Sequence, residues 1–242
     1  MAQAIKVNRL TPAQLTELSR LNTCVAASAI ETFGVRMRNT GFADAAIRCL
    51  FKELPPVLGY AATARIRSAD PPREGHRYFY YDRADWWNQI LTIPPPRIVV
   101  IEDMDEHPGL GAFVGGVHAH ILLALGCVAL VTNGSVRDIP DVRTAGLQVF
   151  ASNVAVSHAY SHVFDFGGTV RVGGLTVAPG ELIHGDLHGV QTIPLEIADK
   201  VPAAAHEILR RRQRLIDACR SGDFSLEKLQ GIIKHEEEES NL

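Results

Sequence analysis

An arginine followed directly by an aspartate closes the apolar segment Val128–Asp138. The guanidinium of Arg137 is a planar fork of donors, which can hold a carboxylate through two parallel hydrogen bonds. The adjacent Asp138 supplies carboxylate oxygen, the ligand type that Mg²⁺ prefers. The pair therefore has the residue types needed to bind a carboxylic acid beside a divalent metal ion.

A second anion-binding feature precedes this pair. Two glycines begin an apolar stretch, Val117–Leu125, that is predicted to be a helix. The first N–H groups of a helix lack intrahelical partners and lie at the positive end of its dipole, so they favour an anion. We expect such groups at Gly115, Gly116, Val117 and His118. Because a glycine-opened helix followed by an Arg-Asp pair also occurs where nothing binds, a structural role stays open.

Strands and helices alternate around the pair. β-Branched runs predict buried strands, and glycines or polar clusters separate them from helical segments. This alternation favours a mainly parallel βαβ core. The predicted series is strand Arg97–Glu102, helix Val117–Leu125, strand Val128–Thr132, turn Asn133–Ser135, helix Asp141–Ala145 and strand Gln148–Val154.

The remainder of the chain divides into three parts. The first part is predicted to contain a helix over Thr11–Phe33 with Thr11 as its N-cap, a helix over Asp44–Leu50, a strand over Leu58–Ile66 and a helix over Arg83–Leu91. A hairpin turning at Gly173-Gly174 and the strands Glu181–Gly185 and Val190–Ile193 indicate an antiparallel or barrel-like section. Two polar helices with a narrow apolar stripe, Pro202–Ser221 and Ser225–Lys234, are typical of a surface or a subunit boundary.

Composition excludes several classes of protein. The 242 residues carry 24 basic and 27 acidic side chains, a net charge of -3 without a clustered basic face, so nucleic acid is not expected as a partner. The most apolar window, Ala119–Val131, is too short to cross a bilayer. The N-terminus shows no secretion signal, and Cys24, Cys49, Cys127 and Cys219 form no close pair. We expect reduced core thiols and a cytoplasmic protein.

Two blocks of sequence resemble the RraA-like family. The first is Ala112–Val117, with Gly126 and Val128–Asp138, and the second is Val172–Leu182, with Gly185–Val190 and Ile193-Pro194. The family includes regulators of ribonuclease E activity and the class II 4-hydroxy-4-methyl-2-oxoglutarate aldolases. The resemblance extends over roughly Leu21 to Ile208.

The resemblance implies a fold and an assembly. The fold would be an α/β layered sandwich with a swivelling-domain (phosphohistidine-domain-like) core, with mixed sheets and flanking helices. Residues 21–200 would form this domain, residues 1–20 a helical lead-in and residues 201–242 a C-terminal helical extension. The chain would assemble as a homotrimer or homohexamer, with sites between subunits.

The resemblance also implies a chemistry. Arg137 would bind the carboxylate of a pyruvate-like substrate, and Asp138 would be the direct protein ligand of Mg²⁺ or Mn²⁺. Amides near Val117 and His118 would hold the other end of the substrate. The metal ion would stabilise the enolate as a carbon–carbon bond breaks, a Lewis-acid role. The protein would thus be a lyase that releases pyruvate from a 2-oxo dicarboxylic acid, as an aldolase or an oxaloacetate decarboxylase.

The chain departs from the aldolases at two positions. An acidic residue usually stands where this sequence has Gly116, and an aspartate where it has Asn133. Both departures remove negative charge near the expected metal ion. His118 or His120 could replace the lost base, although residues two apart on a helix do not face the same way. A further acid from a neighbouring subunit's C-terminal helix would be Glu207 or Asp217.

These departures keep a second reading open, in which the protein is a non-catalytic oligomeric regulator or binding protein. No glycine-rich nucleotide loop supports a methyl-donor site. Other histidines form weaker candidates. His184 and His188 flank Asp186 and suggest a metal cluster, although hydrogen-bonding histidines and a structural Asp186 are commoner. His158 and His162 would share a face of a helix, but their surroundings fit a loop equally well.

Overall fold

The computed structural model describes residues 9–72 and 84–240, with side chains as far as residue 235. Within these residues, one large mixed sheet has the strand order β1-β6-β5-β3-β2-β10-β11, with β4 paired to β5 and β7 paired to β2. The strands are β1 Arg48–Cys49, β2 Val57–Arg67, β3 Arg97–Asp103, β4 Ala112–Val114, β5 Cys127–Val136, β6 Gln148–Val154, β7 His162–Phe166, β10 Leu182–Asp186 and β11 Gly189–Ile193. A separate hairpin joins β8 Val170–Val172 and β9 Leu175–Val177.

The sheet combines the two predicted sections. Strands β2, β3, β5 and β6 run parallel to one another, as the βαβ pattern predicts. The hairpin of β10 and β11 adds to β2 in antiparallel orientation, so glycine-rich sequence late in the chain completes a sheet begun early. The predicted α/β fold with mixed sheets and flanking helices is confirmed.

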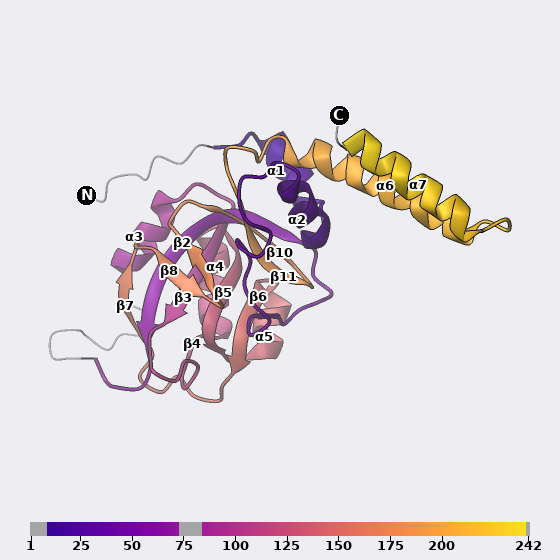
Figure 1. Ribbon diagram of the computed structural model, residues 1–242. Helices are drawn as coiled ribbons and strands as arrows, with labels where there is room; N and C mark the ends of the chain where they lie inside the picture. The colour runs from indigo at the N-terminus through magenta and orange to yellow at the C-terminus, as the bar shows by residue number, and fades with distance from the viewer. Residues whose placement is uncertain (1–8, 73–83, 241–242) are drawn as a thin grey trace.

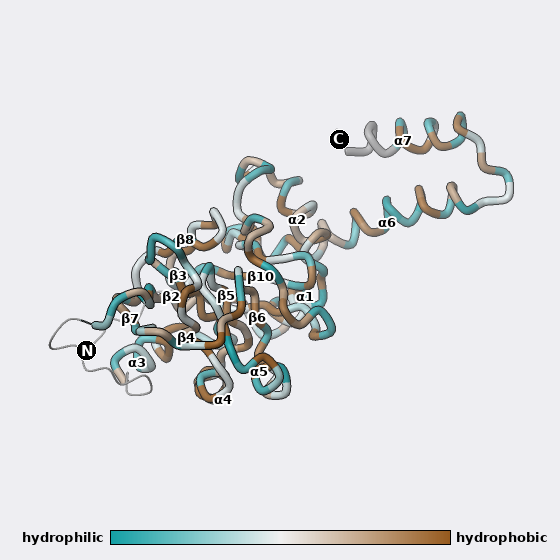
Figure 2. The backbone as a smooth tube through the Cα atoms, turned by 90° about the horizontal axis from the view of Figure 1, so that it is seen from below, coloured by the Kyte–Doolittle hydropathy of each residue, from teal (hydrophilic) through white to brown (hydrophobic). Residues whose placement is uncertain are grey.

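Helices α1 to α5 and the first turns of α6 cover one face of the sheet, and the β8–β9 hairpin covers the other, whereas the rest of α6 and α7 project away from the sheet (Figures 1 and 2). The helices are α1 Pro12–Ser19, α2 Thr23–Glu31, α3 Ala84–Thr92, α4 Gly116–Ala124, α5 Ile139–Ala145, α6 Val201–Arg220 and α7 Leu226–Ser240. Arg83, which the sequence assigns to α3, lies outside the described residues. The main core lies between these helices and the sheet, and it includes Leu18, Ile30, Ile90, Leu122 and Val142.

The single helix predicted over Thr11–Phe33 is wrong. Thr11 does cap a helix, and the side chain of Gln14 accepts a hydrogen bond from the N–H of Thr11, but that helix ends at Ser19. Asn22 has extended backbone angles, and its side chain accepts a hydrogen bond from the N–H of Val25 at 2.8 Å. An N-cap of this kind starts a new helix, because it satisfies an amide that has no partner within the helix.

The helix predicted over Asp44–Leu50 is also wrong. Asp44 Oδ1 accepts a hydrogen bond from the N–H of Ala46 at 2.9 Å, which favours a turn. Beyond it Ile47 is buried, Arg48 exposed and Cys49 buried, a period of two that is typical of a strand. Arg48 and Cys49 accordingly form β1, paired with β6.

The turn predicted over Asn133–Ser135 is the third error, and it bears on the site. β5 continues to Val136 with an irregularity after Thr132, whose hydroxyl accepts a hydrogen bond from Gly134 N–H at 2.9 Å. The far end of β5 gains β4 as a partner. The extended strand therefore leads directly to Arg137, with no intervening turn.

The cysteines divide into two kinds. Cys49 and Cys127 are buried, as expected of core thiols, and burial raises the pKa of Cys127 to about 12. Cys24 and Cys219 are exposed, so the expectation of a core position is wrong for them. All four are free thiols. No helix in the described part of the chain is long and apolar enough to cross a membrane.

Candidate functional site

Two strand–helix junctions meet at Arg137 and Asp138. The N–H of Arg137 donates to the carbonyl of Val114 at 3.0 Å, which fastens the end of β5 to the end of β4. The N–H of Gly116, in the first turn of α4, donates to Asp138 Oδ2 at 3.2 Å. The predicted carboxylate clamp, the predicted metal ligand and the start of α4 are thus brought together.

The backbone at Asp138 is in the left-handed region, with φ 53 and ψ 43. Aspartate tolerates this conformation better than most residues because its short side chain can hydrogen-bond locally. The residue is the N-cap of α5, yet its carboxylate does not cap that helix. It turns towards α4 instead, which places a negative charge at the start of a neighbouring helix.

Gly115 is required by close approach. A Cβ atom at this position would lie 2.6 Å from Asp138 Oδ2 and 3.0 Å from Arg137 Cγ. Contacts this short do not occur between real side chains, so any larger residue would displace the pair. The first glycine of the motif therefore makes room for Arg137 and Asp138 to lie beside the helix start.

Gly116 has a different neighbour, Asp141. A Cβ atom at Gly116 would lie 3.0 Å from Asp141 Cβ and 3.4 Å from its Oδ2. An acidic side chain at position 116 would therefore crowd Asp141. The structure instead brings an acid to this place from the first turn of α5. Sequence reasoning missed Asp141, although its position three residues after Asp138 is a spacing that brings side chains together at a helix start.

The carboxyl group of Asp138 is held in its charged form. Desolvation opposes ionisation, but the hydrogen bonds from Gly116 N–H and the Arg137 guanidinium outweigh it. The positive charges of Arg137 and His158 act in the same direction, and the pKa of Asp138 lies below its ordinary value. Asp138 is therefore an anion over the neutral range, as a metal ligand must be.

Only one of the three guanidinium nitrogens of Arg137 has a partner among the described residues. Its Nε donates to Asp138 Oδ1 at 3.2 Å, and 28% of the side chain is exposed. In the described part of the chain, the two terminal nitrogens have no protein partner. They form one edge of the guanidinium fork, which suits a carboxylate held by two parallel bonds.

The histidines of α4 separate as the helix geometry requires. The ring of His118 is buried and packs against Phe113, with 5.0 Å between ring centroids, whereas His120 is exposed. Val117 between them is 55% exposed. His118 can therefore offer a ligand its backbone N–H but not a solvent-facing ring.

His158 is a further candidate at this site, and the sequence did not single it out for this role. It lies in a loop, and its Nδ1 is 3.3 Å from the carbonyl of Ala112, at the start of β4. Its charge contributes to the lowered pKa of Asp138. His162 begins β7 and bonds the carbonyl of Tyr160, so the two histidines do not share a helix. Only tertiary structure brings His158 near the pair.

Asn133 has a structural role. Its Oδ1 accepts a hydrogen bond from Asp103 N–H at 2.7 Å, and its Nδ2 donates to Asp103 O at 3.0 Å. An aspartate could accept the first bond but could not donate the second. This two-way bond explains an asparagine where the aldolases have an acid.

The cluster around Asp186 is a scaffold. Asp186 accepts hydrogen bonds from Thr23 N–H at 2.9 Å and from His188 N–H at 2.8 Å. His184 is fully buried between Thr23 Oγ1 and the carbonyl of Leu21. The structural role expected for Asp186 fits this network, which ties the start of α2 to the β10–β11 hairpin.

The residues present fit a weakly held Mg²⁺ or Mn²⁺. Among the described residues, no group of three or more His, Cys, Asp or Glu side chains could hold a metal ion. Mg²⁺ is nevertheless commonly bound through one or two carboxylates, with water completing its shell. Asp138 supplies one charged carboxylate, which accepts a hydrogen bond from Gly116 N–H, and Asp141 also lies beside Gly116. The donor set fits a mostly hydrated ion better than a caged one.

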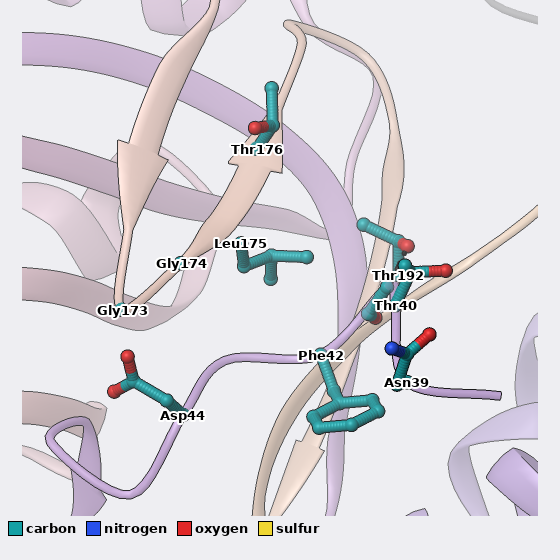
Figure 3. A pocket seen from close by; sticks show the side chains of 10 residues that line it. Asn39, Thr40, Phe42, Asp44, Gly173, Gly174, Leu175, Thr176 and Thr192 are labelled. Atoms are coloured by element: carbon teal, nitrogen blue, oxygen red, sulfur yellow. Dashed lines mark hydrogen bonds between the residues drawn. The ribbon is translucent and has the colours of Figure 1, made fainter. Parts of the chain in front are cut away.

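A cavity of about 420 Å³ lies elsewhere, between residues 39–44 and the β8–β9 turn (Figure 3). Its walls carry the carboxylate of Asp44 and the hydroxyls of Thr40 and Thr176, but no basic side chain. The lining of this cavity therefore offers no positive charge to an acidic ligand.

Comparisons with known proteins agree with the fold. A curated relative, protein DlpA of Legionella pneumophila, is 25% identical over 154 residues, which are 62% of this chain and 24% of that protein. The chain thus matches only about a quarter of that relative's length. A solved structure from Pseudomonas syringae has a TM-score of 0.69 at 21% identity, covering 95% of this chain and 98% of that one.

A second solved structure shows the same architecture. Streptomyces coelicolor RraAS2, described as an unusual member of the RNase ES inhibitor RraA protein family, has a TM-score of 0.65 at 21% identity. It covers 86% of this chain and 98% of its own. Likeness at this identity shows the fold alone. The family model RraA-like (aldolase/RraA) matches residues 23–191, and the chain therefore belongs to the RraA-like family.

Proposed function

We propose that the protein is a divalent-metal-dependent lyase that releases pyruvate from a 2-oxo or hydroxy-2-oxo dicarboxylic acid. The observation that carries this proposal is the pair of terminal guanidinium nitrogens of Arg137, which have no partner in the described part of the chain. They lie next to the charged carboxylate of Asp138 and the start of α4. A dicarboxylic 2-oxo acid offers a carboxylate for the first group and a metal-chelating oxygen for the second.

Each residue has a defined part. Arg137 binds and orients the substrate carboxylate. The N–H groups of Gly115, Val117 and His118 favour negative charge at the other end, whereas that of Gly116 already donates to Asp138 Oδ2. Asp138 holds Mg²⁺ or Mn²⁺, which when bound supplies positive charge at the 2-oxo group.

Cleavage of the carbon–carbon bond leaves its electron pair on the carbon next to the 2-oxo group, so a proton must reach that carbon. The other fragment would leave as carbon dioxide or, from a 4-hydroxy acid, as a carbonyl compound whose hydroxyl proton has been removed. Asp141, which lies beside Gly116, and His158, whose charge acts on Asp138, are candidates to hold or move this proton. His120 is exposed on α4 and offers a third candidate.

The assembly is part of the proposal. We expect a homotrimer or homohexamer in the cytoplasm, with sites between subunits and Glu207 or Asp217 supplied by a neighbour. In its own chain Glu207 pairs with Arg211 at 2.9 Å, and Asp217 accepts a hydrogen bond from Gln213. The division into residues 1–20, 21–200 and 201–242 stays a prediction, with residues 1–8 outside the described part.

Pyruvate release tests the function directly. The full chain is incubated with oxaloacetate or with 4-hydroxy-2-oxo acids, with Mg²⁺ or with a chelator. We expect metal-dependent release that Asp138→Ala abolishes. Release that survives Asp138→Ala would show that the metal ligand is wrongly assigned.

The second candidate is a non-catalytic regulator or binding protein. It is favoured by the lack of a three-residue metal-binding group among the described residues. It predicts that calorimetry detects no Mg²⁺ or Mn²⁺ binding and that a pull-down recovers a protein partner. Tight metal binding that Asp138→Asn removes would argue against it.

A further inference from the structure

The cavity beside the β8–β9 turn is formed by segments that are distant in sequence (Figure 3). The N–H of Asp44 donates to the carbonyl of Gly173 at 2.8 Å, and the N–H of Thr192 donates to that of Gly41 at 2.9 Å. These bonds hold residues 39–44 against the hairpin and against β11. The fold therefore builds this cavity, and its volume of about 420 Å³ lies within the range of small-molecule sites, about 300–1,000 Å³.

The lining has an apolar centre. In Figure 3 the side chain of Leu175 lies in the middle of the lining, and the ring of Phe42 lies below it. Leu175 belongs to the core on this face of the sheet, whereas 47% of Phe42 is exposed. The face of an aromatic ring carries partial negative charge, so it attracts the C–H groups of a ligand. The centre of the cavity therefore suits a ligand with an apolar face.

Polar side chains surround this apolar centre. In the view of Figure 3 the carboxylate of Asp44 lies on one side and the hydroxyl of Thr176 on another. Asn39 and the hydroxyls of Thr40 and Thr192 lie on a third side. A ligand in this cavity would therefore meet polar groups around its edge.

Three of these polar groups have hydrogen-bonding capacity that the described part of the chain leaves unused. Asp44 Oδ1 accepts a hydrogen bond from the N–H of Ala46 at 2.9 Å, but no described residue donates to Asp44 Oδ2. The amide of Asn39 and the hydroxyl of Thr176 also have no partner among the described residues. A carboxylate oxygen accepts, whereas an amide and a hydroxyl both donate and accept. Hydroxyl groups of a ligand can satisfy all three.

The charges around the cavity favour a neutral ligand. The lining includes the carboxylate of Asp44 but no basic side chain, so it repels an anion. The guanidinium of Arg36 packs against Gly41 from a neighbouring cavity, where it donates to Thr192 Oγ1 at 2.9 Å. This positive charge disfavours a cation in turn. An uncharged ligand therefore fits better than a sugar phosphate, a uronic acid or an amine.

We propose that this cavity binds a neutral cyclic sugar. A pyranose ring has apolar C–H faces and hydroxyl groups around its edge, which matches an apolar centre surrounded by polar groups. One C–H face lies on Phe42, and a hydroxyl donates to Asp44 Oδ2. Further hydroxyls bond Asn39 and Thr176.

The proposed sugar site is separate from the site at Arg137. The β8–β9 hairpin covers the face of the sheet opposite to α4, and the lining of the cavity shares no residue with the Arg137 site. The proposal therefore goes beyond the proposed lyase function and does not depend on it.

Saturation-transfer difference NMR of the full chain tests the proposal. D-Glucose, D-galactose, D-mannose and D-xylose are the sugar probes. Sorbitol carries similar hydroxyls without a ring, and putrescine is an amine. We expect saturation transfer to the C–H protons of at least one sugar, weaker transfer to sorbitol and none to putrescine. Absence of transfer to all four sugars, equal transfer to sorbitol, or transfer to putrescine alone would overturn the proposal.

A pair of phenylalanine variants assigns the signal to this cavity. Phe42→Ala removes the ring on which the sugar lies, and we expect the dissociation constant for the sugar to rise about two- to tenfold. Phe164→Ala is the matched control, because Phe164 is 52% exposed and lies outside the lining. It should keep the wild-type affinity. Equal weakening by the two variants would contradict the proposed site.

A change of charge tests the polar edge without removing a large side chain. Asp44→Asn keeps an oxygen that can accept from Ala46 N–H but removes the charged acceptor at Oδ2. Because hydrogen bonds to charged groups are the stronger ones, we expect the dissociation constant to rise about tenfold or more. Asp199→Asn, at an exposed aspartate outside the lining, should leave it unchanged. Wild-type affinity in Asp44→Asn would refute the proposal.

Discussion

The clusters around Asp186 and Asp138 contain similar residues but differ in their roles. At Asp186 both carboxylate oxygens accept main-chain hydrogen bonds, and the carboxylate is 5% exposed. At Asp138 both oxygens also accept, but the side chain is 38% exposed and its partner Arg137 keeps its terminal donors unspent. The hydrogen bonds of the first cluster are all made within the protein, whereas the second cluster leaves the terminal donors of Arg137 available to a ligand.

The difference separates scaffold from site. A buried carboxylate whose hydrogen bonds are all internal stabilises the fold, and removing it leaves amides without acceptors. The exposed pair Arg137 and Asp138, beside two glycines and the start of α4, contributes little to stability and leaves room for a small anion. Residue type alone does not distinguish the two clusters, but the destination of each hydrogen bond does.

The largest expected effect is at Arg137. Arg137→Ala removes the two-bond carboxylate clamp, and charged hydrogen bonds are each worth about 1.5–3 kcal/mol. We expect kcat/KM for the 2-oxo acid to fall by about 10²–10³-fold. Arg143→Ala is the matched control, because it removes an exposed arginine of α5 that pairs with Glu53, and it should change kcat/KM little. Equal losses in both variants would refute the clamp.

Isosteric changes at the two aspartates sharpen the comparison. Asp186→Asn places an amide donor against one of two N–H groups, so we expect the free energy of unfolding to drop by about 2 kcal/mol. Asp138→Asn keeps a residue that tolerates the left-handed backbone, and we expect a drop below about 0.5 kcal/mol. Urea unfolding of both variants measures the difference. Similar losses would mean that Asp138 is as structural as Asp186.

A smaller effect is expected at Gly115. Gly115→Ala places a methyl group 2.6 Å from Asp138 Oδ2, so the carboxylate must move. We expect about a tenfold loss of kcat/KM, or about 1.4 kcal/mol, with little change in unfolding. Gly222→Ala serves as the control, because a Cβ there meets nothing within 4 Å. Unchanged activity in Gly115→Ala would show that the position of Asp138 is unimportant.

The smallest effect is a pH dependence of the scaffold. Burial lowers the pKa of His184, against the opposing charge of Asp186 and the carbonyl of Leu21. The unfolded chain therefore binds the proton more readily, and the free energy of unfolding falls as the pH drops below about 6.5. Urea titrations between about pH 8 and about pH 5.5 measure the slope. His184→Gln should flatten it, and an unchanged slope would exclude His184 as its source.

The sequence predicted the parts of this protein that local pattern determines. The alternation from Arg97 to Val154 gave a parallel core because buried strands and helices have distinct periods. The Gly173-Gly174 turn is also determined locally, because both residues adopt positive φ, at 54° and 75°, which glycine allows without strain. The adjacency of Arg137, Asp138 and the start of α4 followed from consecutive strand–helix junctions.

Other features depend on contacts that are distant in sequence. Asn133 looked like a turn residue, but it bonds the main chain of Asp103, 30 positions away. His158 approaches the pair through a loop that no periodicity describes. Asp141 lies beside Gly116, 25 positions earlier in the chain, because α4 and α5 start next to each other. The short strand at Arg48 forms because β6 offers an edge, which local propensity does not encode.

Calorimetric titration of pyruvate into the full chain tests most directly whether Arg137 and Asp138 form one binding site. With Mg²⁺ present we expect binding to the wild type, at least about tenfold weaker binding to Asp138→Asn and no detectable binding to Arg137→Ala. A chelator should weaken wild-type binding to the level of Asp138→Asn. Equal affinity of the wild type and Arg137→Ala for pyruvate would contradict this account of the site.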